Sequence, residues 1–248
     1  MSKVIAFVAA LLIVVSPVSA GAVAQTLPVF SADVDVLRFD PAGRGRLVVA
    51  LGDLRRARHV AVVVPGSDVD VRRFGSLLAM ARAVRTAAGR DDVAAVAWLG
   101  YDTPEGLGID AATGGLARAG AVELAAFVRE LPAAHVSVLC HSYGTVVCAL
   151  ADLNGVGDVV FTGSPGVRAS SVAELRTGAR VWAARSSGDW TGWVPKVRVG
   201  DLGHGTDPVA PEFGARIFPA GDGSHDEYYR VGGVALGEIV RIVTGDVR

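Results

Sequence analysis

The most informative stretch of this 248-residue chain is Val136-Ser137-Val138-Leu139-Cys140-His141-Ser142-Tyr143-Gly144-Thr145-Val146-Val147. Its first half is the continuous apolar run of a buried strand, and its second half has the composition of a helix. Ser142 stands at the junction between them. A serine in a tight strand-to-helix turn is typical of a nucleophile elbow, which exposes the hydroxyl at the end of the strand.

The elbow pattern is Gly-x-Ser-x-Gly, because the strand and the helix pass very close to each other and the serine itself is strained. Gly144 keeps the second glycine position, and Cys140, which is also small, stands at the first. An ordinary strand-to-helix turn with a helix-capping serine is the alternative. The strand before Ser142 and the helix after it favour the nucleophile.

A serine hydroxyl needs a general base, and the base needs a carboxylate that orients it. With a nucleophile elbow the chain order is serine, then acid, then histidine. The predicted strand Ala179–Ala184 is followed by Asp189, which is the candidate acid. The last predicted strand, Ala215–Pro219, is followed by His225, which is the candidate base. We therefore expect Ser142, Asp189 and His225 to form a catalytic triad.

Other histidines compete for the role of base. His204 lies between two glycines in a loop before the last strand and is the alternative base. His141 neighbours the serine, but alternation along the strand turns its side chain to the opposite face. His59 and His135 begin strands, so we expect them at the opposite end of the sheet.

Other aspartates compete for the role of acid. Asp207 precedes Pro208 and is expected to shape a turn. Asp158 begins a strand, at the wrong end of the sheet. Asp226, beside His225, is expected to cap the final helix.

An oxyanion hole needs two backbone N–H groups aimed at the developing negative charge. The residue after the nucleophile, Tyr143, is expected to supply one of them. The second is expected from the loop Pro65-Gly66-Ser67-Asp68, with Ser67 as the first choice and Asp68 as the second. A plain turn between a strand and a helix would suit Gly66 equally well.

From about Val34 onward, strand-like and helix-like runs alternate. The predicted strands are Arg46–Leu51, His59–Val64, Val93–Leu99, His135–Cys140, Asp158–Thr162, Ala179–Ala184 and Ala215–Pro219. The predicted helices are Phe74–Ala88, Ala117–Leu131, Tyr143–Leu153, Val172–Arg176 and Tyr228–Val243. Continuous apolar strands that alternate with helices indicate an α/β fold, with a mostly parallel central sheet and helices on both faces.

The remaining segments are a predicted hairpin and two long loops. The runs Val34–Arg38 and Arg46–Leu51, joined across Pro41-Ala42-Gly43, are expected to pair at one edge of the sheet. The loops Gly100–Gly115 and Gly188–Gly214 are rich in glycine and proline. Long loops in a compact domain are usually functional, so we expect these two to shape the substrate pocket.

Composition excludes several classes of protein. Hydrophobic residues make up 51% of the chain, charged residues 20%, and the formal net charge is −1. A disordered chain would be less hydrophobic and more highly charged, and a nucleic-acid-binding protein would carry a basic surface. The length fits one large domain, which we place at residues 25–248.

Residues 1–24 are expected to be a secretory signal peptide. Lys3 precedes the apolar run Val4–Val15, which Pro17 ends, and small residues follow. Cleavage is expected after Ala20 or Ala24. The apolar run is shorter than the roughly 20 residues that span a bilayer, so an uncleaved anchor is the weaker alternative. We expect an exported protein without stable membrane insertion after cleavage.

The two cysteines lie close together in the sequence. Cys148 follows Gly144 by one helical turn, on the helix face that packs near Cys140. A disulfide in an exported protein and a pair of buried free thiols both fit this spacing. No pair of histidines or cysteines has the spacing of metal ligands, so neither a metal nor a cofactor is expected.

Six stretches together carry a family resemblance. They are Val64-Pro65-Gly66-Ser67, Leu99-Gly100-Tyr101-Asp102-Thr103-Pro104, His141-Ser142-Tyr143-Gly144-Thr145, Phe161-Thr162-Gly163-Ser164-Pro165-Gly166, Gly205-Thr206-Asp207-Pro208 through Pro211-Glu212-Phe213-Gly214-Ala215, and Gly223-Ser224-His225 with Tyr228-Tyr229. The chain resembles, over residues 45–245, a family of bacterial α/β-hydrolases that is common in high-GC Gram-positive bacteria and long catalogued as a domain of unknown function.

The resemblance implies an α/β-hydrolase fold and a serine-hydrolase site with Ser142 as nucleophile and His225 as base. Only the strand context supports Asp189. Family members usually have glycine where this chain has Cys140. The resemblance supplies no substrate.

The leading hypothesis is an exported serine hydrolase that cleaves a small-molecule or lipid ester of a carboxylic acid. An acyltransferase or an amidase would use the same triad, so the fold does not choose between them. A non-catalytic binding protein on a hydrolase scaffold is the third hypothesis. No nucleic acid partner is expected.

Overall fold

The computed structural model describes residues 25–133 and 135–247. The expected signal peptide, residues 1–24, lies outside the described residues. Within the described ranges no helix combines the length and the apolar character that crossing a membrane requires. The elements are β1 Val34–Asp40, β2 Arg46–Leu51, β3 His59–Val64, α1 Phe74–Ala88, β4 Val93–Leu99, α2 Ile109–Ala112, α3 Gly115–Arg129, β5 His135–His141, α4 Gly144–Leu150, β6 Asp158–Thr162, η1 Val172–Glu174, β7 Arg180–Ala184, η2 Trp190–Trp193, η3 Pro211–Phe213, β8 Arg216–Ile217 and α5 Val234–Thr244.

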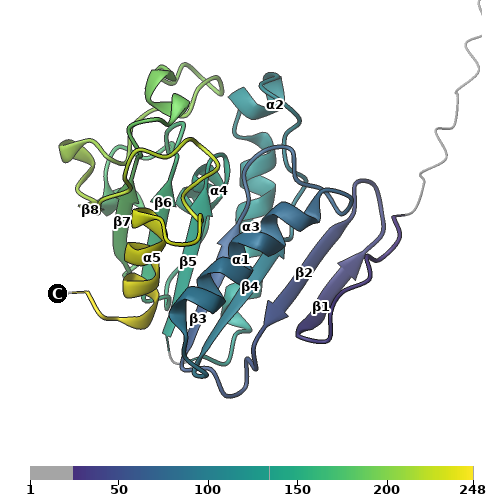
Figure 1. Cartoon of the computed structure of the whole chain (residues 1–248). Coiled ribbons are helices and arrows are strands. Elements are labelled where there is room, and N and C mark those ends of the chain that lie inside the picture. Colours follow the sequence, from purple (N-terminus) through teal and green to yellow (C-terminus); the bar gives the residue numbers. More distant parts are fainter. Residues whose placement is uncertain (1–24, 134, 248) are drawn as a thin grey trace, which may run out of the picture.

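The strands form one eight-stranded sheet in the order β1-β2-β4-β3-β5-β6-β7-β8 (Figure 1). β1 pairs with β2 and β2 with β4 in antiparallel fashion, and all later neighbours are parallel. The mostly parallel α/β sheet and the edge hairpin predicted from the sequence are confirmed. Because the parallel strands run the same way, their carboxyl ends share one edge, and the connecting loops gather there.

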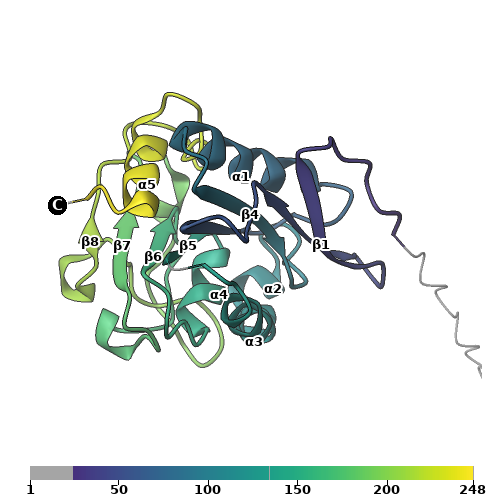
Figure 2. The ribbon, with the colours of Figure 1, turned by 90° about the horizontal axis from the view of Figure 1, so that it is seen from below.

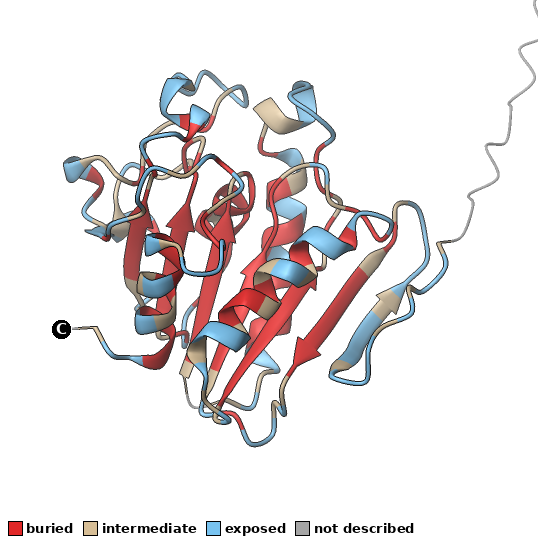
Figure 3. Cartoon of the chain, in the orientation of Figure 1, coloured by how far each residue is buried: buried red, intermediate tan, exposed pale blue. Residues whose placement is uncertain are grey.

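Helices cover both faces of the sheet, as the strand composition requires. In Figure 2, α1 and α5 lie on one side of the strands and α2, α3 and α4 on the other. Alternate residues of β3 serve the two layers: Val60, Val62 and Val64 join the core under α3 and α4, and Ala61 and Val63 join the core under α1 and α5. The inner strands are buried throughout, whereas the edge strand β1 is largely exposed (Figure 3).

Three predicted elements differ in the structure. The predicted helix Val172–Arg176 is only the 3-10 turn η1, because one helical turn is too short to nucleate and Glu174 bonds back to the amide of Ser170. The predicted helix Tyr228–Val243 begins six residues later, at Val234. The positive φ of 75° at Gly232 breaks the helical path before that point.

The last predicted strand, Ala215–Pro219, shrinks to the two residues of β8. β8 is exposed and pairs only at Trp182–Arg216 and Ala183–Ile217 of the sheet edge. The segment from 218 to 233 then runs back over the carboxyl edge of the sheet as a loop, which places residues 225 to 229 above β5. The residues that were predicted to end the last strand and to begin the last helix therefore form the loop that approaches Ser142.

Candidate active site

Ser142 occupies a sharp turn between β5 and α4. Its φ of 54° is in the left-handed region, which is rare for a residue with a side chain. The Ser142 amide donates to the carbonyl of Thr162 on β6, and its own carbonyl accepts from the Thr145 hydroxyl at 2.7 Å. These bonds hold the strained turn in place. The serine side chain is consequently presented at the carboxyl edge of the sheet.

Two glycines allow the turn to approach the neighbouring strand. A Cβ on Gly144 would lie 2.6 Å from the Pro65 carbonyl oxygen, and one on Gly66 would lie 2.5 Å from the Ser142 Cβ. Both distances are too short for real side chains. Glycine is therefore required at both positions, which explains the second glycine of the elbow pattern.

The first glycine position of the pattern is filled by half of a disulfide. Cys140, fully buried at the end of β5, is bonded to Cys148 on α4, with 6.4 Å between their Cα atoms. The sequence allowed either a disulfide or two free thiols at these cysteines, and the structure contains the disulfide. It closes a short loop that contains Ser142, so the strand and the helix on either side of the elbow are covalently joined.

The structure brings the three predicted triad residues together. Ser142 Oγ lies 2.9 Å from His225 Nε2, and His225 Nδ1 lies 2.9 Å from Asp189 Oδ1. Ser142 follows β5, Asp189 follows β7 and His225 follows β8, so three loops converge at one edge of the sheet. The Asp189 and His225 side chains are buried.

Asp189 is ionised and heavily hydrogen-bonded. Burial alone would raise the pKa of its carboxyl, but hydrogen bonds from His225, Tyr228 and Thr191 outweigh burial and hold this pKa well below its ordinary value. The Thr191 amide and hydroxyl both donate to Oδ1 at 2.8 Å, and the Tyr228 hydroxyl donates to Oδ2 at 2.5 Å. An ionised Asp189 can only accept, so His225 Nδ1 carries a proton, and in the neutral ring Nε2 accepts from the Ser142 hydroxyl.

Strand alternation predicted that the His141 side chain points away from the site, and this prediction is wrong. Its ring packs 4.7 Å from the ring of His225 and 5.7 Å from that of Tyr228. Alternation fails because His141 is the last strand residue before the turn at Ser142. Burial, helped by the nearby His225, lowers the pKa of His141 to about 3, so its ring is neutral.

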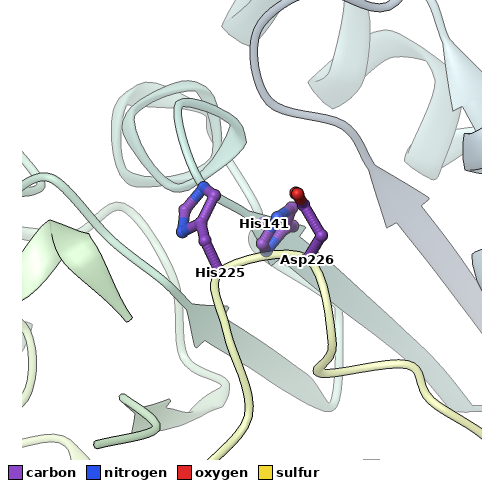
Figure 4. Close-up of side chains that lie close together, drawn as sticks. All are labelled: His141, His225 and Asp226. Carbon is purple, nitrogen blue, oxygen red and sulfur yellow. The ribbon is translucent and has the colours of Figure 1, made fainter. Parts of the chain in front are cut away.

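One group of side chains in the described part of the chain has the placement of metal ligands. His225 and Asp226 extend from one loop, with His141 beside them, and their ligand atoms lie within 4.8 Å of one another (Figure 4). His225 already uses both ring nitrogens, on Asp189 and Ser142. An ion bound here would have to take Nε2 away from Ser142, so metal binding and the triad geometry exclude each other.

The competing histidines lie where they cannot act on Ser142 directly. His204 Nε2 lies 2.7 Å from the Ala111 carbonyl oxygen, and this bond ties together the two long loops. His59 and His135 face each other at the amino end of the sheet, with ring centroids 5.6 Å apart.

The competing aspartates have structural partners or other positions. Asp207 pairs with Arg185 and accepts from the Val209 amide, which makes it the turn residue that was expected. Asp158 pairs with His135. The prediction that Asp226 caps the final helix is wrong, because α5 begins eight residues later with Gly233 as its N-cap.

Ser67 and Tyr143 both line a pocket that Ser142 also lines. The Asp68 amide is occupied, since it donates to the Pro104 carbonyl at 2.9 Å. No such bond is made by the amides of Ser67 and Tyr143 to any residue that the structure describes. The positions of Tyr143 and Ser67 therefore suit an oxyanion hole, and Asp68 drops out as a donor.

Two pockets meet at Ser142. The base-side pocket, about 820 Å³, reaches His225 and is lined further by residues that include Asp68, Ser76, Met80, His141, Asp226 and Arg230. The apolar pocket, about 510 Å³, reaches Tyr143 and is lined further by residues that include Ala111, Ala112, Val194, Val197, Val199 and Leu202. Both long loops contribute to the apolar pocket. Four residues border both pockets: Ser67, Leu107, Ser142 and Trp190.

Sequence reasoning gave no role to three residues that support the site. Tyr228 orients Asp189, and its oxygen also accepts from the Ser186 amide. Thr191 donates twice to Asp189, and the Asp-x-Thr spacing is a signal that could have revealed it. Lys196 donates to the Ser164 and Thr191 carbonyls, and burial lowers its pKa to about 8. Tyr228 lies in one of the stretches that carry the family resemblance, which is a signal for it, whereas no local pattern marks Lys196.

Comparison with known sequences gives matches over most of the chain. Residues 40–199 match a family model described as alpha/beta hydrolase. An uncharacterized protein of Mycobacterium tuberculosis is 32% identical over 260 residues, which cover 88% of this chain and 39% of that protein. An uncharacterized protein of Mycobacterium bovis is 35% identical over 162 residues, which cover 56% of this chain and 60% of that protein. The chain spans 39% to 60% of the length of these curated relatives.

Comparison with solved structures shows the same architecture in distant sequences. The esterase PE8 superposes with a TM-score of 0.55 at 15% identity, over 80% of this chain and 97% of that one. A serine hydrolase without a lid from Xanthomonas campestris gives a TM-score of 0.52 at 17% identity, over 88% of this chain and 97% of that one. At such identities the likeness concerns the fold.

Proposed function

The chain belongs to the alpha/beta hydrolase family, and on this premise we propose that it is an exported serine hydrolase that cleaves carboxylic esters. The single observation that carries the proposal is the chain of contacts from Ser142 Oγ to His225 Nε2 and from His225 Nδ1 to Asp189. An ionised, buried aspartate behind a histidine that faces a strained serine is the arrangement that activates a hydroxyl. The mycobacterial relatives agree with the actinobacterial family resemblance of the sequence.

In the proposed reaction, Ser142 Oγ attacks the ester carbonyl carbon while His225 Nε2 takes the hydroxyl proton. The carbonyl oxygen becomes an oxyanion, which the Tyr143 and Ser67 amides stabilise. When the carbon–oxygen bond to the alcohol breaks, His225 returns the proton to the leaving alkoxide and the acyl group stays on Ser142. Water then attacks the acyl-enzyme with His225 again as base, and the carboxylic acid leaves with Ser142 restored.

Asp189 keeps its negative charge throughout and stabilises the imidazolium that His225 becomes. Asp189 stays ionised because its pKa is low: the hydrogen bonds from Tyr228 and Thr191 stabilise the carboxylate and not the protonated acid. Neutral His141 packs against His225 without adding a competing charge.

Export is the second part of the proposal. The sequence of residues 1–24 supports it, and the Cys140–Cys148 disulfide is the kind of bond that oxidising compartments maintain. Expression of the full chain in a secreting bacterial host, followed by N-terminal sequencing of the protein outside the cytoplasm, tests it. The proposal expects a mature chain beginning at Gly21 or Gln25. Retention of an intact chain in the cytoplasm would overturn export.

A fluorophosphonate probe tests the catalytic proposal, because it phosphonylates only an activated serine. Folded wild-type protein is expected to be labelled, and Ser142→Ala is expected to lose the label. Ser170→Ala is the matched control, since Ser170 is exposed and away from the site, and it should label like wild type. Failure to label folded wild-type protein would favour a non-catalytic binding protein.

The acceptor of the acyl group distinguishes the remaining alternatives. Release of free carboxylic acid from a p-nitrophenyl ester in water supports hydrolysis. Labelling by the probe together with acyl transfer to an added alcohol in preference to water would instead identify an acyltransferase. Labelling with turnover of anilides and not of esters would identify an amidase.

A further inference from the structure

The two pockets at Ser142 differ in which part of the catalytic machinery they reach. His225 lines the base-side pocket and not the apolar pocket, and Tyr143 lines the apolar pocket and not the base-side pocket. This asymmetry bears on the substrate, because the two halves of an ester have different requirements during the reaction. The following steps rest on the proposed function.

The leaving alcohol must receive its proton from His225 Nε2, so its oxygen must lie within hydrogen-bond distance of that atom. Nε2 already lies 2.9 Å from Ser142 Oγ and opens on the base-side pocket. The alcohol half of the ester therefore lies in the base-side pocket. The acyl half lies on the other side of the carbonyl carbon, next to the Tyr143 amide and in the apolar pocket.

The apolar pocket has the lining that a hydrocarbon chain requires. Val197, Val199 and Leu202 leave 61%, 76% and 53% of their surface exposed, and these residues face a pocket that ends at Ser142. Its one imidazole ring, that of His204, is hydrogen-bonded to the Ala111 carbonyl, and burial lowers the pKa of this ring. A fatty acyl chain would cover this apolar surface without burying an unpaired charge.

The walls of the apolar pocket are fixed to each other. An isolated bridge pairs Thr113 with Leu202, and the Gly203 amide donates to the Ala112 carbonyl at 2.8 Å. Asp201 accepts two hydrogen bonds from Arg118, at 2.8 and 2.9 Å, and pairs with Arg168. The first two contacts join the two long loops, and the contacts of Asp201 tie the second loop to α3 and to Arg168, so the walls of the pocket are held in place.

The base-side pocket adds polar groups to an apolar lining that includes Ala79, Met80 and Val231. Asp226 is exposed and makes no hydrogen bond or ion pair with the part of the chain that the structure describes. Asp68 and Arg230 lie in the same lining, and a volume of about 820 Å³ exceeds what a methyl or ethyl group would fill. Unpaired carboxylate oxygens in a roomy pocket are acceptors for alcohol hydroxyls.

From this asymmetry we infer that the natural substrate is a fatty acyl ester of a polyol, with the acyl chain in the apolar pocket and the polyol in the base-side pocket. Burying one methylene is worth about 0.8 kcal/mol, which corresponds to about fourfold in rate. A hydrogen bond from a polyol hydroxyl to Asp226 should raise kcat/KM about two- to tenfold.

The acyl half is tested with p-nitrophenyl esters from acetate to palmitate. We expect kcat/KM to rise about fourfold for each methylene until the pocket is filled. Leu202→Trp narrows the pocket and should lower the decanoate-to-acetate ratio at least tenfold, as should Val197→Asp, which places a charge there. Val122→Trp, on the exposed face of α3 and in neither pocket, is the matched control and should keep the wild-type ratio.

The polyol half is tested by comparing the glyceryl and methyl esters of decanoic acid. We expect a glyceryl-to-methyl ratio in kcat/KM of about two to ten, which Asp226→Ala should reduce toward one. Asp222→Ala, in the same loop but in neither pocket, is the matched control.

The outcomes separate this inference from the proposed function. Wild-type protein that is labelled by the fluorophosphonate probe but prefers acetate would overturn the fatty acyl assignment and leave the serine hydrolase standing. A higher rate on the methyl ester, or a ratio that Asp226→Ala does not change, would overturn the polyol assignment. Absence of both labelling and hydrolysis would remove the proposed function itself, and this inference with it.

Discussion

The part of the chain that the structure describes contains two histidine–aspartate pairs, one at each end of the same sheet. His225 Nδ1 lies 2.9 Å from Asp189 at the carboxyl end, and His135 Nε2 lies 2.8 Å from Asp158 at the amino end. In both pairs the aspartate side chain is fully buried. Judged by distance and burial alone, the two pairs are equivalent.

The surroundings of the pairs differ. Asp158 also accepts from Arg180 at 2.8 and 2.9 Å and from the Trp182 indole at 2.7 Å, so its charge is already compensated by a cation. The second ring nitrogen of His225 faces Ser142, whereas the His135 ring packs edge-to-face against His59. A histidine–aspartate pair is therefore a catalytic candidate only where it has a third partner to activate and no cation on its carboxylate.

The largest effect is expected from removing that third partner. Ser142→Ala leaves the carboxyl-end pair with nothing to activate, and we expect kcat/KM for p-nitrophenyl butyrate to fall on the order of 10⁴-fold or more. His135→Ala, at the amino end, should leave kcat/KM close to that of wild type. Equal losses in the two variants would mean that the comparison of the pairs is mistaken.

The next effect separates the two aspartates. Asp189→Asn should lower kcat on the order of 10³-fold, because the amide no longer stabilises the His225 imidazolium. Asp158→Asn should keep the activity per folded molecule but reduce the free energy of unfolding by about 3 kcal/mol, since Arg180 loses its buried partner. Steady-state kinetics and urea denaturation of both variants measure the two effects. A stable Asp158→Asn protein without activity would contradict the assignment.

A pH effect of comparable size arises from the second histidine at the carboxyl end. Burial lowers the pKa of His141 from 6.5 in the unfolded chain to about 3 in the folded one. Between these values the unfolded chain binds the additional proton, so stability is complete above pH 6.5 and decreases as the pH falls toward 3. The contribution of His141 is about 1.4 kcal/mol per pH unit in that window. Urea denaturation between pH 4 and 7 should show a shallower slope for His141→Asn, and an unchanged slope would contradict the assignment.

The disulfide under Ser142 is expected to act on stability and not on chemistry. Opening a loop with a sequence separation of 8 should cost about 2.5 kcal/mol in the chain-entropy model. The double variant Cys140→Ala with Cys148→Ala should therefore denature at lower urea concentration. Its kcat should stay within about threefold of wild type, because Thr145 and the Thr162 carbonyl still hold the elbow. A large loss of kcat would show that the disulfide itself positions Ser142.

The positions of Ser142, Asp189 and His225 could be predicted from the sequence because each follows a predicted strand. In a parallel sheet the carboxyl ends of such strands share an edge, so identifying the strands is enough to bring the three residues together. Of the weakest predicted strand, Ala215–Pro219, only two residues form β8. His225 nevertheless contacts Ser142, because the loop after β8 is long enough to extend to it.

The features that could not be predicted depend on contacts between distant segments. His141 was misplaced because side-chain alternation stops at a strained turn, and only the fold brings the His225 ring against it. The start of the last helix was misplaced because Tyr228 and Tyr229 suit a helix locally but are buried in the loop that carries His225. The division into two pockets likewise requires both long loops to be placed in space.

The smallest effect concerns the donor that distinguishes Asp189 from Asp158. Asp189 Oδ2 accepts from the neutral Tyr228 hydroxyl, where Asp158 accepts from the Arg180 guanidinium. Tyr228→Phe removes one hydrogen bond to a carboxylate and leaves the Ser186 amide without its acceptor, so we expect kcat to fall about tenfold. Because the missing bond stabilised the ionised carboxylate, the pKa of Asp189 should rise toward its ordinary value while the carboxyl stays ionised. A wild-type kcat in Tyr228→Phe would mean that Tyr228 contributes by packing against His141 and not through Asp189.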